Sequence, residues 1–489
     1  MKDLHNLEKL LNELSVSGRK GYSLPPNDVG NNKLSSLIPE KYLSKEKPAL
    51  PEVSEPEIAR HFINMSVTNH HIDKGFYPLG SCTMKYNPKI NEATSRLPGF
   101  SGIHPHQHES TVQSALQLMY ELEKSLCGFT GMDSFTLQPA AGSQGELTGI
   151  MIMRKFHSEN GNPRKKVLIP DSAHGTNPAS VVISGYESVP VKSNDKGLVD
   201  VNDLSSKLDE EVAGMMITNP NTLGLFEEEI STIAKKIHDV GALLYLDGAN
   251  FNALISLMKP AYMGFDITHL NLHKTFSTPH GGGGPGSGPV GVISKLAKYL
   301  PIPKVQKVGE RYTLSLDFPD SIGRIHGFYG NYGILVRAYT YIKLLGSDGF
   351  RSASKNAIIN ANYLRKLVNE RYDIPYGQNC MHEFVVSAES QKKRGAKAGD
   401  IVKRLLDFGV HAPTVYFPLI VKEAMMIEPT ESESKDSLEN FSAILEKIDD
   451  EISENPALLT DAPFNTPVRR LDEAKAVREL RLTWDKVGK

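Results

Sequence analysis

The sequence predicts an α/β protein with three parts: an extended N-terminal arm, a large domain and a smaller C-terminal α/β domain. Three observations predict this fold. Short apolar segments alternate with helical periodicity between residues 111 and 293, a second α/β pattern follows residue 335, and residues 20–100 are rich in Pro, Asn, Ser and Gly. Strands that alternate with helices are typical of a mainly parallel sheet with helices on both faces.

Residues 1–105 are expected to form an N-terminal helix followed by an extended arm, and residues 20–100 carry one convincing helix, EPEIARHFINMS. The first residues place Leu4, Leu7, Leu11 and Leu14 on one helical stripe, but the acidic residues between them argue against a secretory or transit signal. A segment with so many turn-forming residues cannot bury a core alone.

The large domain is expected over residues 106–335. Its first helix begins at Thr111, where apolar residues recur at helical spacing, and is expected to stop at Gly128. Further helices are expected in GELTGIMIMRKF and STIAKKIHDVG. Seven buried strands are expected at residues 135–137, 167–169, 189–191, 215–218, 243–246, 267–272 and 290–293.

The C-terminal domain is expected over residues 336–489. A long helical stretch, NYGILVRAYTYIKLLG, leads into it, and HEFVVSA, the helix GDIVKRLLDFGV and the apolar stretch TVYFPLIV follow. A last helix presents one apolar face, made of Leu438, Phe441, Leu445, Ile448 and Ile452. This pattern predicts a second, smaller α/β unit.

Composition excludes several classes of function. Among 489 residues, 55 Lys and Arg against 57 Asp and Glu give a net charge of −2, which argues against a nucleic-acid partner. The three cysteines, Cys82, Cys127 and Cys380, lie far apart and form no C-x-x-C pair, which argues against a disulfide framework or a thiolate zinc site. No apolar run approaches the ~18 residues that cross a bilayer. We expect a cytoplasmic protein without a membrane anchor.

The segment HGGGGPGSGP formally contains a G-x-G-x-x-G pattern at Gly281, Gly283 and Gly286. A dinucleotide-binding loop follows a strand and opens a helix, whereas this segment precedes the strand-like PVGVI. We therefore reject nucleotide binding and expect a flexible turn beside an active site.

A carboxylate and a lysine follow neighbouring predicted strands. Asp247 ends the apolar run LLYLD, and Lys274 follows the next strand, 27 residues later. A solvated lysine is the ordinary explanation of any single Lys. At the carboxyl edge of a parallel sheet, however, an acid and an amine together are what pyridoxal phosphate requires, because the amine binds the cofactor covalently and the acid partners its ring nitrogen.

Three further strand ends complete a possible cofactor site. The loop QPAAGSQGE opens a helix, so amides near Gly142 and the Ser143 hydroxyl would face a phosphate. His174 is placed to lie flat on a pyridine ring, and Thr218 or Asn219 to bond the ring hydroxyl. Each loop taken singly is more simply a capped helix or a turn. The whole series, in this order along the chain, predicts a pyridoxal-phosphate site.

These segments resemble the fold-type-I pyridoxal-phosphate enzymes. Their amino-acid sequences are similar to those of the P-protein family of the glycine cleavage system, glycine dehydrogenase (decarboxylating). Within this family they are most similar to the second subunit of the form that is split into two chains. The segments that carry the resemblance are GFYPLGSCTMKYNPK, QPAAGSQGE, PDSAHGTNPAS, ITNPNTLGLFE, YLDGAN and NLHKTFSTPHGGGGPG.

The resemblance implies a role for each matching residue. Lys274 would form a covalent aldimine with pyridoxal 5'-phosphate, and His174 would stack on the ring and act in catalysis. Asp247 would keep the ring nitrogen protonated. The remaining cofactor contacts would be Ala249 against the ring, Ser143 and Gln144 at the phosphate, and Thr218 or Asn219 at the ring hydroxyl. Placement alone suggests His273 or His174 as a proton carrier near neutral pH.

The resemblance also implies the reaction and the partners. Glycine would lose carbon dioxide, and its aminomethyl group would pass to the lipoyl group of the H-protein, with the turn at Gly281–Gly288 admitting the lipoyl arm. The chain would pair with a homologous subunit 1, two copies of each, and would be inactive alone. The arm before residue 100 would be the candidate for wrapping that partner. Two alternatives remain open: an ordinary amino-acid decarboxylase or lyase of this fold, and a noncatalytic scaffold subunit, against which the intact set of Lys274, Asp247 and His174 argues.

One segment departs from the sequence pattern of the family. Near the end of the arm the chain carries His104, His106 and His108, interrupted by Pro105. Alternating imidazoles suggest a metal site, but no fourth ligand cluster is recognisable. We expect a surface loop there and no metal.

Overall fold

The computed structural model describes residues 9–26, 28, 30, 32–46, 48–281, 286–480 and 482. The chain folds into two compact units, one made of Ile72–Thr460 and the other of Met1–His71 with Asp461–Lys489. The division into three parts at residues 105 and 335 stays a prediction. Among the described residues, no helix combines the length and apolar character needed to cross a membrane.

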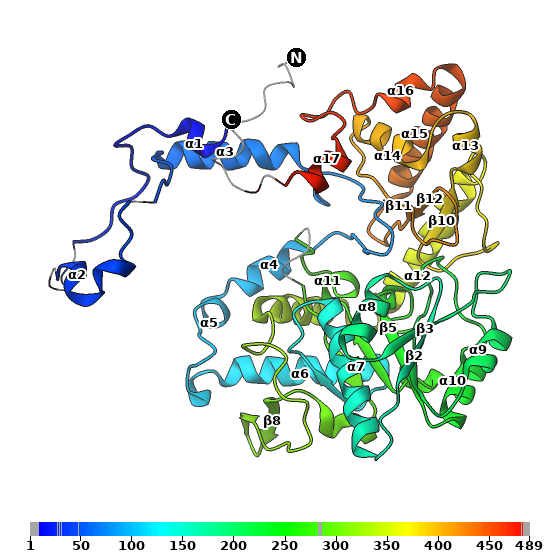
Figure 1. The fold of residues 1–489 in the computed structure, drawn as a ribbon, viewed down its shortest axis with the longest axis horizontal. Coiled ribbons are helices and arrows are strands. Elements are labelled where there is room, and N and C mark those ends of the chain that lie inside the picture. Colours follow the sequence, from blue (N-terminus) through cyan, green and yellow to red (C-terminus); the bar gives the residue numbers. More distant parts are fainter. Residues whose placement is uncertain are drawn as a thin grey trace. The chain divides into compact units, whose positions relative to one another are not determined.

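The unit that holds the N-terminal segment contains short helices and one longer helix. Its elements are α1 (Leu11–Leu14), α2 (Leu34–Leu37), η1 (Glu40–Tyr42), α3 (Glu55–Thr68) and α17 (Glu473–Arg478) (Figure 1). The helix expected in EPEIARHFINMS is α3. It begins at a capping box, because Glu57 accepts hydrogen bonds from the backbone and hydroxyl of Ser54. Of the leucine stripe, Leu4 and Leu7 lie outside the described residues.

The larger unit is built around a seven-stranded sheet in the order β1-β7-β6-β5-β4-β2-β3. The strands are β1 (Ser134–Thr136), β2 (Lys166–Pro170), β3 (Glu187–Val191), β4 (Val212–Thr218), β5 (Leu243–Gly248), β6 (Ile267–Leu270) and β7 (Val290–Val292). All neighbours pair in parallel except β7, which is antiparallel to β6 and β1. Each expected strand is present, but 267–272 is too long: β6 ends at Leu270, because α11 (Leu272–Thr275) begins directly after Asn271.

Both faces of this sheet are covered, as predicted. Along β4, Val212 and Met215 enter one core, whereas Ala213 and Met216 enter the other. The first core is closed by α6 (Gln113–Thr130), α10 (Ile230–Asp239) and α12 (Tyr332–Val368), and the second by α7 (Gly142–Glu159) and α8 (Thr176–Ile183). The predicted stop of α6 at Gly128 is wrong, because the helix continues until Gly131 takes the left-handed conformation at φ 75°.

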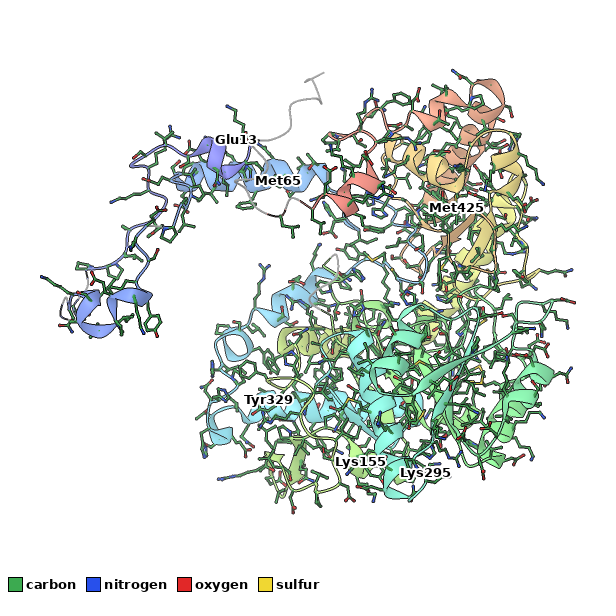
Figure 2. All side chains as sticks on the ribbon, in the orientation of Figure 1. Glu13, Met65, Lys155, Lys295, Tyr329 and Met425 are labelled. Atoms are coloured by element: carbon green, nitrogen blue, oxygen red, sulfur yellow. The ribbon has the colours of Figure 1, made fainter. Side chains whose placement is uncertain are left out.

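The small sheet follows α12, whose helical path is interrupted at Gly346. Its order is β10-β12-β11, from β10 (Phe384–Ser387), β11 (Thr414–Val415) and β12 (Ala424–Ile427). The sheet lies with α13 (Glu389–Lys393), α14 (Ala398–Asp407), α15 (Lys435–Glu454) and α16 (Ala457–Thr460) in the yellow-to-red part of Figure 1. The five apolar residues predicted on one helix face all enter its core, and Met425 of β12, labelled in Figure 2, lies there too.

The remaining elements are short. They are α4 (Lys89–Ser95), α5 (Pro98–Ser101), η2 (Glu109–Thr111), α9 (Val201–Lys207), η3 (Phe251–Ala253), η4 (Pro260–Met263), η5 (Ser294–Tyr299) and the hairpin β8 (Lys304–Val308) with β9 (Arg311–Ser315). The sequence analysis did not predict the hairpin or β12.

Part of the predicted arm is built into the larger unit. Leu79 pairs with Ile427 beside β12, and the Gly80 N–H donates to the Met426 carbonyl at 3.2 Å. A Cβ on Gly80 would lie 2.2 Å from Met426 Cγ, so this close approach requires glycine. The segment around residue 80 therefore packs against β12 of the same chain. The wrapping of a partner by the arm stays a prediction.

Candidate active site

The candidate site lies at the carboxyl edge of the large sheet. The strands β1, β2, β4, β5 and β6 run in the same direction, so the loops that follow them leave one edge. In register, Asp247 of β5 lies between Thr218 of β4 and His269 of β6. The predicted acid and two polar neighbours thus meet at one level of the sheet.

Lys274 is a buried lysine on α11, directly after β6. Its Nζ donates a hydrogen bond to the Ser81 carbonyl at 2.5 Å. Ser81 belongs to the segment GFYPLGSCTMKYNPK, which the sequence analysis used as a family signature and to which it gave no place in the site. Besides the loops that follow β5 and β6, the surroundings of the lysine therefore include the segment around Ser81.

Asp247 is held as a carboxylate in the interior. Burial alone raises the pKa of its carboxyl group, but His269, Asn177, the Ala249 amide and Lys274 together lower this pKa below its ordinary value. Asn177 Nδ2 donates to Oδ2 at 3.0 Å, and the Ala249 N–H donates to Oδ1 at 2.9 Å. Asp247 can therefore keep a protonated nitrogen charged at neutral pH.

His269 connects Asp247 to Tyr245. Its Nε2 lies 3.3 Å from Asp247 Oδ1, and its Nδ1 lies 3.0 Å from the Tyr245 hydroxyl. The Tyr245 hydroxyl also donates to the Gly145 carbonyl at 3.3 Å, so His269 belongs to a chain of polar groups that ends at Asp247. His269 was not predicted from the sequence, although an imidazole next to the end of a buried strand is a usable signal.

Asn177 also links Asp247 to a second buried carboxylate, Glu146 of α7. Asn177 Nδ2 lies 3.1 Å from Glu146 Oε2, and the hydroxyls of Thr176 and Ser180 donate to the same carboxylate. Glu146, Asp247 and His269 together have the ligand types of a metal site. Side chains of α8 already donate hydrogen bonds to both carboxylate oxygens of Glu146, so this residue connects α7 to α8.

The first turn of α7 fits an anion. Helix amides in a first turn lack intrahelical acceptors, and Ser143 is exposed there. A Cβ on Gly142 would lie 2.4 Å from Asn271 Oδ1, so the helix start approaches the lysine-bearing segment closely. Gln144 uses its side chain within the fold, because Oε1 accepts from the Ala140 amide at 2.7 Å and Nε2 donates to the Ile325 carbonyl at 3.1 Å. Gln144 therefore offers an anion its backbone amide.

His174 and the loop after β4 line the same edge. His174 is exposed, and its Nδ1 lies 2.9 Å from the Thr176 hydroxyl. Among the described residues, the buried Thr218 Oγ1 and Asn219 Nδ2 have no hydrogen-bond partner, whereas Asn219 Oδ1 accepts from the Glu227 amide at 3.0 Å. Buried polar atoms without partners indicate a place for a polar ligand.

His273 stays neutral at physiological pH. Burial, together with the charges of the nearby Lys274 and His280, lowers its pKa to about 3. Burial and Lys274 also lower the pKa of His280. His273 can therefore accept a hydrogen bond from a ligand but cannot store a proton near pH 7.

The end of the glycine-rich turn lies against the loop before α7. The Gly288 N–H donates to the Pro139 carbonyl at 2.9 Å, and a Cβ on Gly288 would lie 2.1 Å from the Ala141 carbonyl oxygen. Residues 282–285, with Gly283, lie outside the described residues, so the predicted passage of a lipoyl arm there stays a prediction. The rings of His104 and His106 are tilted relative to each other, and the His106 ring meets the Phe328 ring edge-on; their role also stays a prediction.

The topology and the position of the lysine define a class. A mainly parallel seven-stranded sheet, a smaller C-terminal sheet and a buried lysine one strand from a buried aspartate are the features of the fold-type-I pyridoxal-phosphate enzymes. The predicted fold class is confirmed by this topology and by the structural match below.

Comparisons with known proteins identify the family. Residues 27–306 match the family model described as glycine cleavage system P-protein, and residues 353–465 match that of the glycine dehydrogenase C-terminal domain. The chain is 57% identical over 481 residues to the probable glycine dehydrogenase (decarboxylating) subunit 2 of Chloroherpeton thalassium, covering 98% of each chain. It is 58% identical to the protein of the same name from Pelodictyon phaeoclathratiforme, covering 97% of this chain and 99% of the relative.

A solved structure supports the same fold. The inhibitor-bound glycine decarboxylase (P-protein) of the glycine cleavage system superposes with a TM-score of 0.73 at 19% identity, covering 85% of this chain and 94% of that one. The chain belongs to the glycine cleavage system P-protein family of enzymes, in the branch whose members are named glycine dehydrogenase (decarboxylating) subunit 2.

Proposed function

We propose that this chain is the pyridoxal-phosphate-carrying catalytic subunit of a two-subunit glycine dehydrogenase (decarboxylating). It removes carbon dioxide from glycine and passes the aminomethyl group to the lipoyl group of an H-protein. The observation that carries the proposal is the buried Lys274 amine at the sheet edge, one strand from an Asp247 held as a carboxylate. Family membership supplies the reaction.

The residues present fit the cofactor. The first turn of α7, with Ser143 and the Gln144 amide, is suited to its phosphate, and the unpartnered atoms of Thr218 and Asn219 are suited to its ring hydroxyl. His174 and Ala249 are the candidates for the two faces of its ring. When bound, pyridoxal phosphate supplies a sink for the electron pair that remains when carbon dioxide leaves.

The side chains of the site have distinct tasks. The Lys274 amine would hold the cofactor covalently. Asp247, supported by His269 and Asn177, would keep a proton on the cofactor's ring nitrogen. The neutral His273 offers a hydrogen-bond acceptor beside Lys274. The covalent link to the cofactor is thus assigned to Lys274, and the charge on its ring nitrogen to Asp247.

We also infer the partners. Relatives of nearly equal length carry the name subunit 2, which implies a subunit 1, and we propose two copies of each chain with no activity from this chain alone. A lipoylated H-protein is the second partner and glycine the substrate. The alternative of an ordinary amino-acid decarboxylase differs in needing no lipoyl carrier.

The experiment measures carbon dioxide released from carboxyl-labelled glycine by the chain with subunit 1 and lipoylated H-protein. Lys274→Ala should lower the rate at least about 1,000-fold, since the covalent step is lost. Lys355→Ala, an exposed lysine on α12, is the matched control. Retained activity in Lys274→Ala would refute the catalytic assignment, and equal rates without H-protein would favour the ordinary decarboxylase. Full activity without subunit 1 would refute the partner requirement.

A further inference from the structure

A second buried cluster of titratable groups lies beside the segment that contacts Lys274. It consists of His382, Glu383 and Glu428, whose side-chain ligand atoms all lie within 4.8 Å of one another. Glu383 directly precedes β10 and Glu428 directly follows β12. All three side chains are fully buried, and none has a task in the reaction described above.

Both carboxylates anchor the loop formed by residues 81–83. Glu383 Oε2 accepts from the Ser81 N–H at 2.7 Å. Glu428 Oε2 accepts from the Thr83 N–H at 2.8 Å, and Oε1 accepts from the Thr83 hydroxyl at 2.5 Å. Ser81 and Thr83 both have left-handed backbones, at φ 64° and 47°, which non-glycine residues keep only when their surroundings hold them.

This loop connects the cluster to the lysine. Ser81 binds both partners through its backbone. Its carbonyl accepts the hydrogen bond from Lys274 Nζ, and its N–H donates to Glu383. The two carboxylates therefore fix the backbone group that holds the amine. A Cβ on Gly224 would lie 1.8 Å from the Glu383 carbonyl oxygen, so the main chain of Glu383 is itself tightly confined.

Lys274 is the cation whose charge lowers the pKa of both Glu383 and Glu428, but it forms no ion pair with either carboxylate among the described residues. In the described part of the chain, no Lys or Arg forms an ion pair with Glu383 or Glu428, and burial lowers the pKa of His382 to about 3, so this imidazole is neutral. His382 Nε2, which has no hydrogen-bond partner among these residues, lies 3.7 Å from Glu383 Oε1 and 3.8 Å from Glu428 Oε1.

Two buried carboxylates within 4.8 Å of each other resist ionising together, because each negative charge opposes the other. Burial and the charge of Glu428 raise the pKa of Glu383 well above its ordinary range, and burial raises the pKa of Glu428. The other titratable groups that act on Lys274 or on the pair are Cys82, Asp247, His273, His280, His382 and Glu431.

We propose that Glu383 and Glu428 share one proton and act as positioning residues for Lys274: both anchor the loop that holds its amine, and together they present a single negative charge to it. The protonated partner keeps its loop contacts without adding a second charge. The Lys274 amine is thereby held by the Ser81 carbonyl, a neutral acceptor, and by no ion pair among the described residues. A covalent step requires an amine that can leave its partner. The relevance to catalysis rests on the proposed function, whereas the shared proton does not.

The shared proton can be measured by infrared spectroscopy of the chain without cofactor. Wild type should show the carbonyl stretch of a protonated carboxylic acid at neutral pH, and this band should disappear in both Glu383→Gln and Glu428→Gln, because the remaining carboxyl group then ionises. The exposed Glu370→Gln should keep the band. A band that is absent in wild type, or that survives either single substitution, would overturn the proposal.

The effect on Lys274 is measured by reductive methylation with formaldehyde, quantified on the Lys274 peptide at a series of pH values. Glu383→Gln/Glu428→Gln should move the labelling curve to lower pH by about one unit, because the neighbouring negative charge is gone. The two single shifts should sum to less than half of the double shift, because each single variant keeps one charge. Additive shifts, or no shift in the double variant, would refute the shared charge.

These measurements separate the two proposals. Formaldehyde reports on the amine without pyridoxal phosphate, so they remain decisive if the cofactor assignment fails. Circular dichroism checks that each variant is folded. If the double variant unfolds, the infrared band in the two single variants decides the question alone.

Discussion

Replacing Lys85 by Met should destabilise the larger unit by about 3–5 kcal/mol. Lys85 is fully buried next to the lysine-bearing helix, and its ammonium group donates to Glu431 Oε1 at 2.8 Å, Asn252 Oδ1 at 2.9 Å and the Thr275 carbonyl at 2.9 Å. Three hydrogen bonds from a charged donor, at about 1.5 kcal/mol each, amount to about 4.5 kcal/mol. Met fills a similar volume, so the loss comes from the unpaired Glu431 and two unsatisfied oxygens.

The assay is urea unfolding followed by circular dichroism at neutral pH. Lys355→Met, on the exposed face of α12, is the control and should stay within about 0.5 kcal/mol of wild type. Adding Glu431→Gln to Lys85→Met should recover part of the loss, because it removes the uncompensated charge. A loss below about 1 kcal/mol for Lys85→Met would refute this reasoning.

The pH dependence of this effect has a definite sign. Burial lowers the pKa of Lys85, but Glu431 and Tyr341 together outweigh burial and raise this pKa above its ordinary value. A raised folded-state pKa gives stability that is fully present below the unfolded value of about 10.4 and is lost as the pH rises through the folded value. The difference between wild type and Lys85→Met should therefore persist from neutral pH to about pH 10 and narrow above it.

Three further substitutions test other contacts. Gly145→Ala would place a Cβ 2.6 Å from the Gly288 carbonyl oxygen, so pyridoxal phosphate should bind at least about tenfold more weakly in a fluorescence titration, whereas Gly128→Ala, which meets open space, should bind normally. His269→Asn should raise the pKa of Asp247. Ionised Asp247 stabilises the fold above its unfolded pKa, and this stability is lost as the pH falls, so acid unfolding of the variant should begin at a higher pH than that of wild type. An unchanged midpoint of acid unfolding would contradict this role. Gly224→Ala, at φ 77° and with a Cβ 1.8 Å from the Glu383 carbonyl oxygen, should lower the free energy of unfolding in urea by about 2–4 kcal/mol, and a loss below about 1 kcal/mol would contradict the packing described.

The large sheet was predictable because its strands are short apolar runs bounded by turn residues. The register that brings Asp247 and Thr218 together follows from such runs in a parallel sheet. The boundaries were less predictable. Gly128 suggests a helix end by its identity, but only the backbone at Gly131 turns left-handed. The strand β12 was missed because its four residues, AMMI, are too few to show a period.

The site was predictable where its residues follow strand ends in order, as Asp247 and Lys274 do. The contacts of Ser81 with Lys274 and of Thr83 with Glu428 join residues 193 and 345 positions apart. Such pairings depend on how the arm segment lies between two sheets, which no local pattern encodes. The shared environment of Glu383 and Glu428 was invisible for the same reason. The family resemblance was confirmed, whereas the individual cofactor contacts stay predictions.

The central claim is that Lys274 carries the cofactor. The most direct measurement mixes the purified chain with pyridoxal phosphate, reduces it with borohydride and locates the pyridoxyl group by mass spectrometry of peptides. We expect the modification on the peptide that contains Lys274, and its loss in Lys274→Ala. Stable modification of a different lysine with Lys274 unmodified, or no adduct at all, would contradict the claim.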